Sequence, residues 1–148
     1  MANTKTYSFL DTNCAITGPG GSFSVTNGAA KEGITFSMRE DKSKLDIGAD
    51  GSGIHSLRAD NSGHVTMRFL KNSPTNALLS AMYNLQKTAS SLWGINVIAC
   101  VSSIGDAISA TGVAFKKQPT VVYAEEAQML EWEFEAIRID ELLAASIA

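Results

Sequence analysis

The chain has 148 residues, the size of one domain that can bury a core of its own. Apolar residues make up 45% of the sequence, which excludes intrinsic disorder as the main interpretation. The formal net charge is -3, and the last 24 residues carry seven acidic side chains against one basic one, Arg138. The sequence therefore lacks the clustered excess of Lys and Arg with which proteins usually grip nucleic acid.

The N-terminal third alternates apolar and polar residues. Its apolar members are Tyr7 and Phe9, then Cys14 and Ile16, then Phe23 and Val25, and finally Ile34, Phe36 and Met38. Turn residues separate these runs, at positions 18–21 and at Asn27 and Gly28. A period of two residues bounded by Gly, Pro and Asn is typical of antiparallel strands joined by tight turns, so we expect a meander.

Residues 41–63 lose this regular pattern. One interpretation is a long functional loop, because connections longer than about 12–15 residues usually carry a function. The other is a hairpin of two weak strands, around Leu45–Ile47 and Ile54–Leu57. The alternation then returns in Val65–Phe69, which predicts a strand.

A single helix is predicted over residues 73–89. Ser73 is a suitable N-cap, and Pro74 occupies the first helical position, where its missing N–H costs nothing. Leu78, Leu79, Met82 and Leu85 form one apolar stripe, which we expect to pack on a sheet.

Four strands are predicted after the helix. They are Leu92–Val101, read as a buried strand, Gly112–Lys116, Thr120–Ala124 and Leu130–Asp140. In the last one the apolar residues change from even to odd positions, which indicates a β-bulge near Ala136 and Ile137. Residues 141–148 are expected to form a C-terminal arm or a helical turn, and residues 1–148 to form a single domain.

The two cysteines, Cys14 and Cys100, are 86 positions apart in apolar surroundings. A secreted disulfide scaffold would carry a denser framework, so we expect both to be buried and reduced. The N-terminus has no apolar signal region, and no stretch has the ~18 consecutive apolar residues needed to span a membrane. These features predict a chain made in the cytoplasm.

Motifs for catalysis, metals and phosphates are weak. His55 and His64 have no neighbouring ligands at zinc spacing, and the segment from Asp46 to Gly51 starts like a calcium loop but has Leu57 where the bidentate Glu belongs. The glycine-rich segments do not lead from a strand into a helix, as a phosphate loop does. We therefore expect no metal, no cofactor and no catalytic residue.

Three acids, Glu131, Glu133 and Glu135, share one face of the last predicted strand. Like charges at this spacing would repel one another if buried. They are therefore expected on a solvated outer face or on the wall of a water-filled space.

At this point the chain resembles the family of phage tail tube proteins. The stretches that carry the resemblance are residues 48–51, 54–59, 61–63, 65–71, 73–79 and 130–134. The likeness extends over most of the chain from about Tyr7 onward. It implies a mainly β fold with one α-helix, an antiparallel sandwich or barrel of the tail-tube type, with no enzymatic activity.

The resemblance also implies an assembly. Tail tube subunits form hexameric rings that stack into a tube, through which double-stranded DNA passes without specific binding when the genome is ejected. In contractile tails a sheath surrounds the tube, and the tape measure protein and baseplate are further expected partners. The expected location is the virion tail.

Physical reasoning extends this picture. Ring closure needs contacts that cover exposed strand edges. The N-terminal arm and the long segment, with Asp46, Asp50, Ile54, His55 and Leu57, are the candidates for contacts between subunits or rings. Glu131, Glu133 and Glu135 are candidates for lining the lumen, because DNA must slide past without phosphate–Lys contacts.

Two other classes stay open. A small-ligand-binding β-barrel would require an enclosed apolar pocket. A hydrolase would use a serine with His55 or His64 and Asp60, although the sequence has no nucleophile elbow.

Overall fold

The computed structural model describes residues 7–25, 29–102 and 104–143, with the backbone alone described at 29–32. Its elements are η1 (Phe9–Asp11), β1 (Asn13–Gly18), β2 (Gly21–Ser24), β3 (Ala29–Met38), β4 (Ser43–Ile47), β5 (Gly53–Leu57), β6 (Gly63–Phe69), α1 (Pro74–Gln86), η2 (Ser90–Leu92), β7 (Asn96–Val101), β8 (Ala107–Lys117) and β9 (Leu130–Leu142). The predicted mainly β architecture with one α-helix is confirmed for the described residues.

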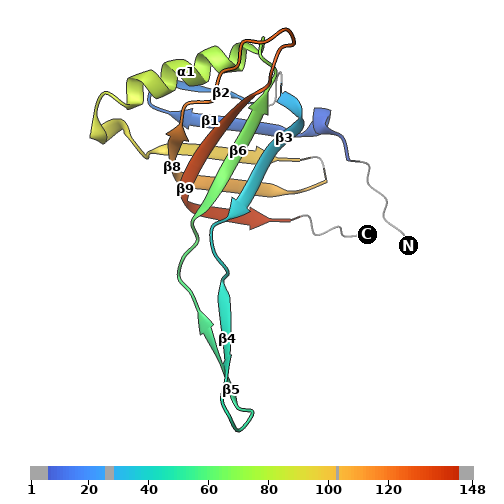
Figure 1. The fold of residues 1–148 in the computed structure, drawn as a ribbon, viewed down its shortest axis with the longest axis vertical. Helices are drawn as coiled ribbons and strands as arrows, with labels where there is room; N and C mark the ends of the chain where they lie inside the picture. The colour runs from blue at the N-terminus through green and yellow to red at the C-terminus, as the bar shows by residue number, and fades with distance from the viewer. Residues whose placement is uncertain (1–6, 26–28, 103, 144–148) are drawn as a thin grey trace.

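Seven of the strands form one antiparallel sheet in the order β2-β1-β7-β8-β9-β6-β3. The sheet folds over on itself into two halves, one with β2, β1 and β7 and the other with β6 and β3. The long strands β8 and β9 take part in both halves. Figure 1 shows β1 running across the view, whereas β3 and β6 run obliquely in front of it. The core lies between the two halves and contains Met67, Phe69, Phe115 and Phe134.

The bend of β8 and β9 explains the change of phase seen in the sequence. Ala136 and Ile139 are both buried on β9, and their partners Val113 and Ala110 are both buried on β8. The two strands therefore exchange their inner and outer faces together.

The predicted bulge near Ala136 and Ile137 is wrong in its location. The pairing of β9 with β6 runs without a shift from Leu130 to Ala136. The pairing of β9 with β8 is also regular from Ala136 to Arg138, and its register shifts between Phe115 and Lys117. Another shift lies where β8 pairs with β7, between Asn96 and Ile98. Gly112 of β8 adopts φ +61°, and a Cβ there would lie 3.0 Å from the Ile137 side chain, so a glycine is required at the bend.

Helix α1 covers one end of the folded sheet (Figure 1). The Ser73 side chain accepts a hydrogen bond from the Thr75 N–H at 3.3 Å, which confirms the predicted cap, but the helix ends at Gln86 instead of 89. Leu79 and Met82 are buried as predicted, whereas Leu78 and Leu85 are nearly half exposed. No helix among the described residues is long and apolar enough to cross a membrane.

A buried amide pair fixes the C-terminal end of the helix. Gln86 Nε2 donates to Asn96 Oδ1 at 2.7 Å, and Asn96 Nδ2 donates to Gln86 Oε1 at 2.8 Å. Gln86 Nε2 also donates to the Pro19 carbonyl at 2.9 Å, in the turn between β1 and β2. A Cβ at Gly18 would lie 1.8 Å from Asn96 Oδ1, so only glycine leaves room for this pair.

Several other predicted elements differ from the structure. Tyr7–Phe9 is not a strand, and the chain there enters η1. Residues 120–124 form no strand. They lie in the connection between β8 and β9, which has no regular structure. Strand β9 continues to Leu142, so the predicted arm at 141–148 begins later than expected, and its residues 144–148 lie outside the described residues. The N-terminal arm before Tyr7 and the predicted turn at Asn27 and Gly28 also lie outside them.

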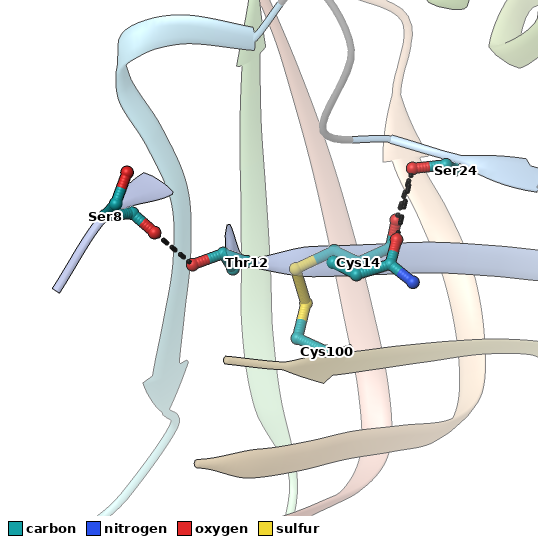
Figure 2. Close-up of a disulfide and its surroundings, with 6 residues drawn as sticks. Ser8, Thr12, Cys14, Ser24 and Cys100 are labelled. Atoms are coloured by element: carbon teal, nitrogen blue, oxygen red, sulfur yellow. Dashed lines mark hydrogen bonds between the residues drawn. A yellow bond between two sulfur atoms is a disulfide. The ribbon is translucent and has the colours of Figure 1, made fainter. Parts of the chain in front are cut away.

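The prediction of two reduced cysteines is wrong for this structure. Cys14 of β1 and Cys100 of β7 occupy directly opposite positions in the antiparallel pair and form a disulfide (Figure 2). Both are buried, as predicted. The sequence separation of 86 residues concealed the pairing, which arises from the register of two strands distant in the chain.

We expect the amide pair to be strongly coupled. Gln86→Met or Asn96→Leu alone should lower the free energy of unfolding by about 2–4 kcal/mol, because each leaves a buried amide unsatisfied. The double variant should lose less than the sum, since both polar groups are then gone. Urea unfolding measures this, with Asn84→Met on the exposed helix face as a control expected within about 0.5 kcal/mol of wild type. Additive losses would show that the two amides act independently.

Candidate assembly surfaces

The long segment at 41–63 is a hairpin that projects away from the body of the protein (Figure 1). Strands β4 and β5 pair with each other alone, and every residue of both strands is exposed. Of the two interpretations of this segment, the hairpin is therefore correct.

The two faces of this ribbon differ in polarity. Cross-strand pairing places Leu45 beside His55 and Ser43 beside Leu57, on the same face as Ile47. The opposite face carries Lys44, Asp46, Ile54 and Ser56. Leu57 is 81% exposed and Ile47 62% exposed, so the first face is an uncovered apolar surface. We call it the apolar hairpin face, made of Leu45, Ile47 and Leu57.

An isolated two-stranded hairpin is marginally stable in water. The base of this one is nevertheless well anchored. Arg58 Nη1 donates to Glu40 Oε2 at 3.0 Å, Lys42 Nζ donates to Asn61 Oδ1 at 2.8 Å, and the Ile139 N–H donates to the Asn61 carbonyl at 2.9 Å. The first two contacts hold the arms of the hairpin together and the third joins its base to β9, while its apolar face stays exposed.

Two aspartate turns shape the tip and the base. Asp50 Oδ1 accepts from the Ser52 N–H at 3.0 Å and from Ser52 Oγ at 2.6 Å. Asp60 Oδ1 accepts in the same way from Ser62 N–H and Oγ. These hydrogen bonds lower the pKa of each carboxyl below its usual value. The bond from the serine hydroxyl has the larger effect, and the bond from the serine N–H has the next largest.

The outer side of the half-sheet β3-β6-β9 with the end of β8 is polar. We call it the charged face, defined by Thr35, His64, Thr66, Arg68, Lys117, Glu131, Glu133 and Glu135. The three glutamates do share this side, as the period of the strand predicts. Glu131 is paired with Arg68 at 3.2 Å and Glu133 with Lys117 at 3.6 Å, so the charges are mixed instead of uniformly negative.

The outer side of the other half-sheet carries small uncharged residues on β1, β2, β7 and β8, and the ion pair of Arg138 and Asp140 on β9. We call the part with small uncharged residues the uncharged face, defined by Ala15, Thr17, Ser22, Ser24, Val97, Ala99, Val101, Ala107 and Ser109. The sequence did not indicate this face, because the apolar run at Leu92–Val101 predicts a buried strand. Strand β7 alternates between buried and exposed residues instead, with small apolar side chains on both sides.

Within the described part of the chain, the sheet ends in two strands that each pair on one side. Strand β2 pairs with β1 and strand β3 pairs with β6, and they are the terminal strands of the seven-stranded order. A terminal strand presents unpaired N–H and C=O groups on its outer side, which is a template for pairing with another chain.

The residues considered for a hydrolase are not arranged as a triad. His55 lies on β5 of the projecting hairpin, whereas His64 lies on β6 in the main sheet. Asp60, Ser62 and His64 border an open hollow of about 390 Å³ together with Glu135. Ser62 Oγ donates directly to Asp60 Oδ1 at 2.5 Å, so the serine is paired to the carboxylate without a histidine between them. No group of three potential metal ligands occurs among the described residues.

The connection at residues 118–129 is a further surface that the sequence did not indicate. It arches past the N-terminal end of α1 (Figure 1). Tyr123 is 88% exposed, and Lys71 Nζ lies 4.4 Å from the centroid of its ring. A short alternating run predicted a strand here, although no neighbouring strand is available to pair with it.

Comparisons with known proteins place this geometry in context. A family model described as "Bacteriophage PhiTE tail tube protein" matches residues 4–144. Among curated proteins none matches the chain.

Solved structures share the fold at low identity. A chain of the anti-feeding prophage baseplate has a TM-score of 0.60 at 9% identity, covering 99% of this chain and 100% of that chain. Two chains come from the PVC extracellular contractile injection system in the extended state. The one from its sheath/tube terminator has a TM-score of 0.59 at 10% identity, with 96% and 100% covered, and the one from its sheath-tube complex has 0.52 at 9%, with 87% and 87% covered. Identities this low establish a common fold alone.

We expect Ser52→Ala to raise the pKa of Asp50 toward its usual value, because the serine hydroxyl is the largest cause of the lowering. Carboxylate chemical shifts followed through an acid titration measure this, with Ser56→Ala as a control that leaves Asp50 unchanged. Since the folded pKa is the lower one, the charged turn favours folding above the unfolded pKa, and this benefit is lost as the pH falls through the folded value. An unaltered titration of Asp50 in Ser52→Ala would contradict this assignment.

Proposed function

The chain belongs to the bacteriophage PhiTE tail tube protein family, and on that premise we propose that it is the repeating subunit of a tube of stacked hexameric rings. Membership makes it a structural protein of the virion tail and not an enzyme. The match over residues 4–144 is the observation that carries the proposal, because it covers both halves of the sheet, the hairpin and the helix.

We extend the proposal to a contractile tail. Its support is the fold shared with chains of contractile injection systems, including one from a sheath-tube complex. In such a tail the tube would contact a sheath on its outside, a baseplate at its end and a tape measure protein within it.

Contacts between copies would use the features that a lone subunit leaves incomplete. The free edges of β2 and β3 suit lateral contacts within a ring, because pairing removes exposed backbone groups. The hairpin suits contacts between rings, since it extends beyond the body and carries an apolar surface. Of the residues predicted for contacts between copies, we assign His55 and Leu57 to this surface, whereas Asp46 and Ile54 lie on the opposite face of the ribbon and Asp50 lies at its tip.

The charged face is the proposed wall of the channel. Its side chains are polar and half-buried or exposed, which fits a water-filled space, and two of its glutamates neutralise Arg68 and Lys117. Those two cations are therefore not free to hold DNA phosphates. Glu131, Glu133 and Glu135 would in this way let the genome pass without specific binding, and the uncharged face would look outward.

We expect the purified protein to form rings or tubes with a central hole in negative-stain electron microscopy. Leu57→Lys should abolish stacking into tubes, because it places a charge on the apolar hairpin face, while the melting temperature stays within about 2 °C since the hairpin is outside the core. Ser56→Lys adds the same charge to the opposite face of the same strand and should still form tubes.

Equal assembly of both variants would remove the apolar hairpin face from the contact. A wild-type protein that stays a monodisperse monomer would contradict the tube and favour the small-ligand-binding barrel.

We expect the triple variant Glu131→Gln, Glu133→Gln, Glu135→Gln to assemble into tubes that retain duplex DNA. Loss of the two ion pairs frees Arg68 and Lys117 for phosphate contacts, so retention should rise several-fold at low salt and disappear at high salt. The matched control is Glu125→Gln, Glu126→Gln, Glu141→Gln, which changes the net charge equally. Equal retention by both variants, or a tube structure with the three glutamates on its outer wall, would overturn the assignment.

A further inference from the structure

We infer that Cys14 and Cys100 form a redox clamp that is open while the subunit is made and closes when the assembled tube meets an oxidising medium. The inference rests on the proposed function, because a tail subunit is made in a reducing cytoplasm, where disulfides are rare, and acts outside the cell. The structure describes the closed state (Figure 2).

The register makes the open state compatible with the same fold. Cys14 and Cys100 are directly paired positions of β1 and β7, and their Cα atoms are 4.0 Å apart. Both side chains are buried among apolar residues such as Ile16 and Ile98. Reduced cysteines pack as small hydrophobic side chains in such a place, so the strands stay in register without the covalent bond.

The clamp fastens β1 and β2, which form one end of the sheet. Strand β2 is terminal and pairs with β1, and β1 joins the remaining strands only through β7. Apart from that pairing, Gln86 Nε2 donates to the Pro19 carbonyl in the turn between β1 and β2. The Ser24 hydroxyl of β2 donates to the Cys14 carbonyl of β1 at 3.3 Å (Figure 2). The covalent bond links two strands 86 residues apart, so closure restricts the unfolded chain strongly.

The approach of a small oxidant to the pair starts at Cys100, of which 6% is exposed. Cys100 lines an open hollow of about 340 Å³ with Val101, Ser109 and Leu142. The hollow lies on the outer side of the half-sheet that contains β7, and its lining also includes Asp140. Cys14 is the more deeply buried partner.

The closing reaction uses a small-molecule disulfide as the oxidant. The Cys100 thiolate attacks one of its sulfurs, which forms a mixed disulfide and releases one small thiolate. The Cys14 thiolate then attacks the Cys100 sulfur and expels the second small thiolate. Two protein thiols are oxidised, the small disulfide is reduced to two thiols, and these take up the two protons that the cysteines lose.

The first measurement counts thiols. Protein from cells lysed with an alkylating agent should carry two alkyl groups by intact mass, and the same protein incubated with oxidised glutathione should carry none. Two free thiols after that incubation would overturn the clamp, and so would a disulfide already complete in the freshly lysed cells.

The second measurement tests what the clamp does. Reduction of the oxidised wild type should lower its melting temperature by about 5–15 °C and speed hydrogen exchange in β1 and β2 more than in β6. The variant Cys14→Ala, Cys100→Ala should not respond to the reductant. An equal melting temperature of oxidised and reduced wild type would overturn the inference.

Electron microscopy separates this inference from the proposed function. Tubes of wild type and of the double alanine variant should look alike, and the oxidised wild-type tubes alone should resist dissociation at the higher temperature. Failure of both proteins to form rings would contradict the tube, whereas tubes of equal thermal resistance would contradict only the clamp.

Discussion

The buried pair of Gln86 and Asn96 is the contact on which the arrangement of the helix and sheet depends. It joins three segments, because Gln86 ends α1, Asn96 begins β7 and the shared Pro19 carbonyl lies in the turn between β1 and β2. Burying any of these polar groups without a hydrogen-bond partner would be costly. The three segments are therefore held in the one relative position in which all of these groups are hydrogen-bonded. Apolar packing of Leu79 and Met82 supplies the burial, and the amides determine where the helix sits.

The two outer faces of the protein follow from the bend at Gly112. Strands β8 and β9 exchange their inner and outer sides there, so one strand contributes Glu131, Glu133 and Glu135 to one half and Ile139 to the core of the other. A single sheet thereby acquires a charged side and a side that is mostly uncharged apart from the Arg138–Asp140 pair. In the proposed tube, the first would face the water-filled channel and the second would face outward.

Patterns of neighbouring residues correctly predicted those features that depend on neighbouring residues alone. Ser73 and Pro74 marked the helix start, and alternation placed the three glutamates on one side. The helix stripe was correct at Leu79 and Met82 but not at Leu85, because the buried position of that turn is Gln86, which pairs with a residue ten positions away. The bulge was misplaced, because the glycine that the bend requires, Gly112, lies on another strand. The disulfide depends on the register of β1 and β7. The hairpin stayed ambiguous in the sequence, since no core contact distinguishes its weak strands from a loop.

The hydrogen bond from the Ile139 N–H to the Asn61 carbonyl has a mechanical consequence. Asn61 lies at the root of the hairpin, and Ile139 lies two residues beyond the point where β9 turns from one half of the sheet to the other. A force on the hairpin therefore reaches β9 through this bond, in addition to β3 and β6, which continue the hairpin along the chain. In the proposed tube, a neighbour that pulls on the hairpin would load three adjacent strands of the sheet together, so that no single strand carries the whole force.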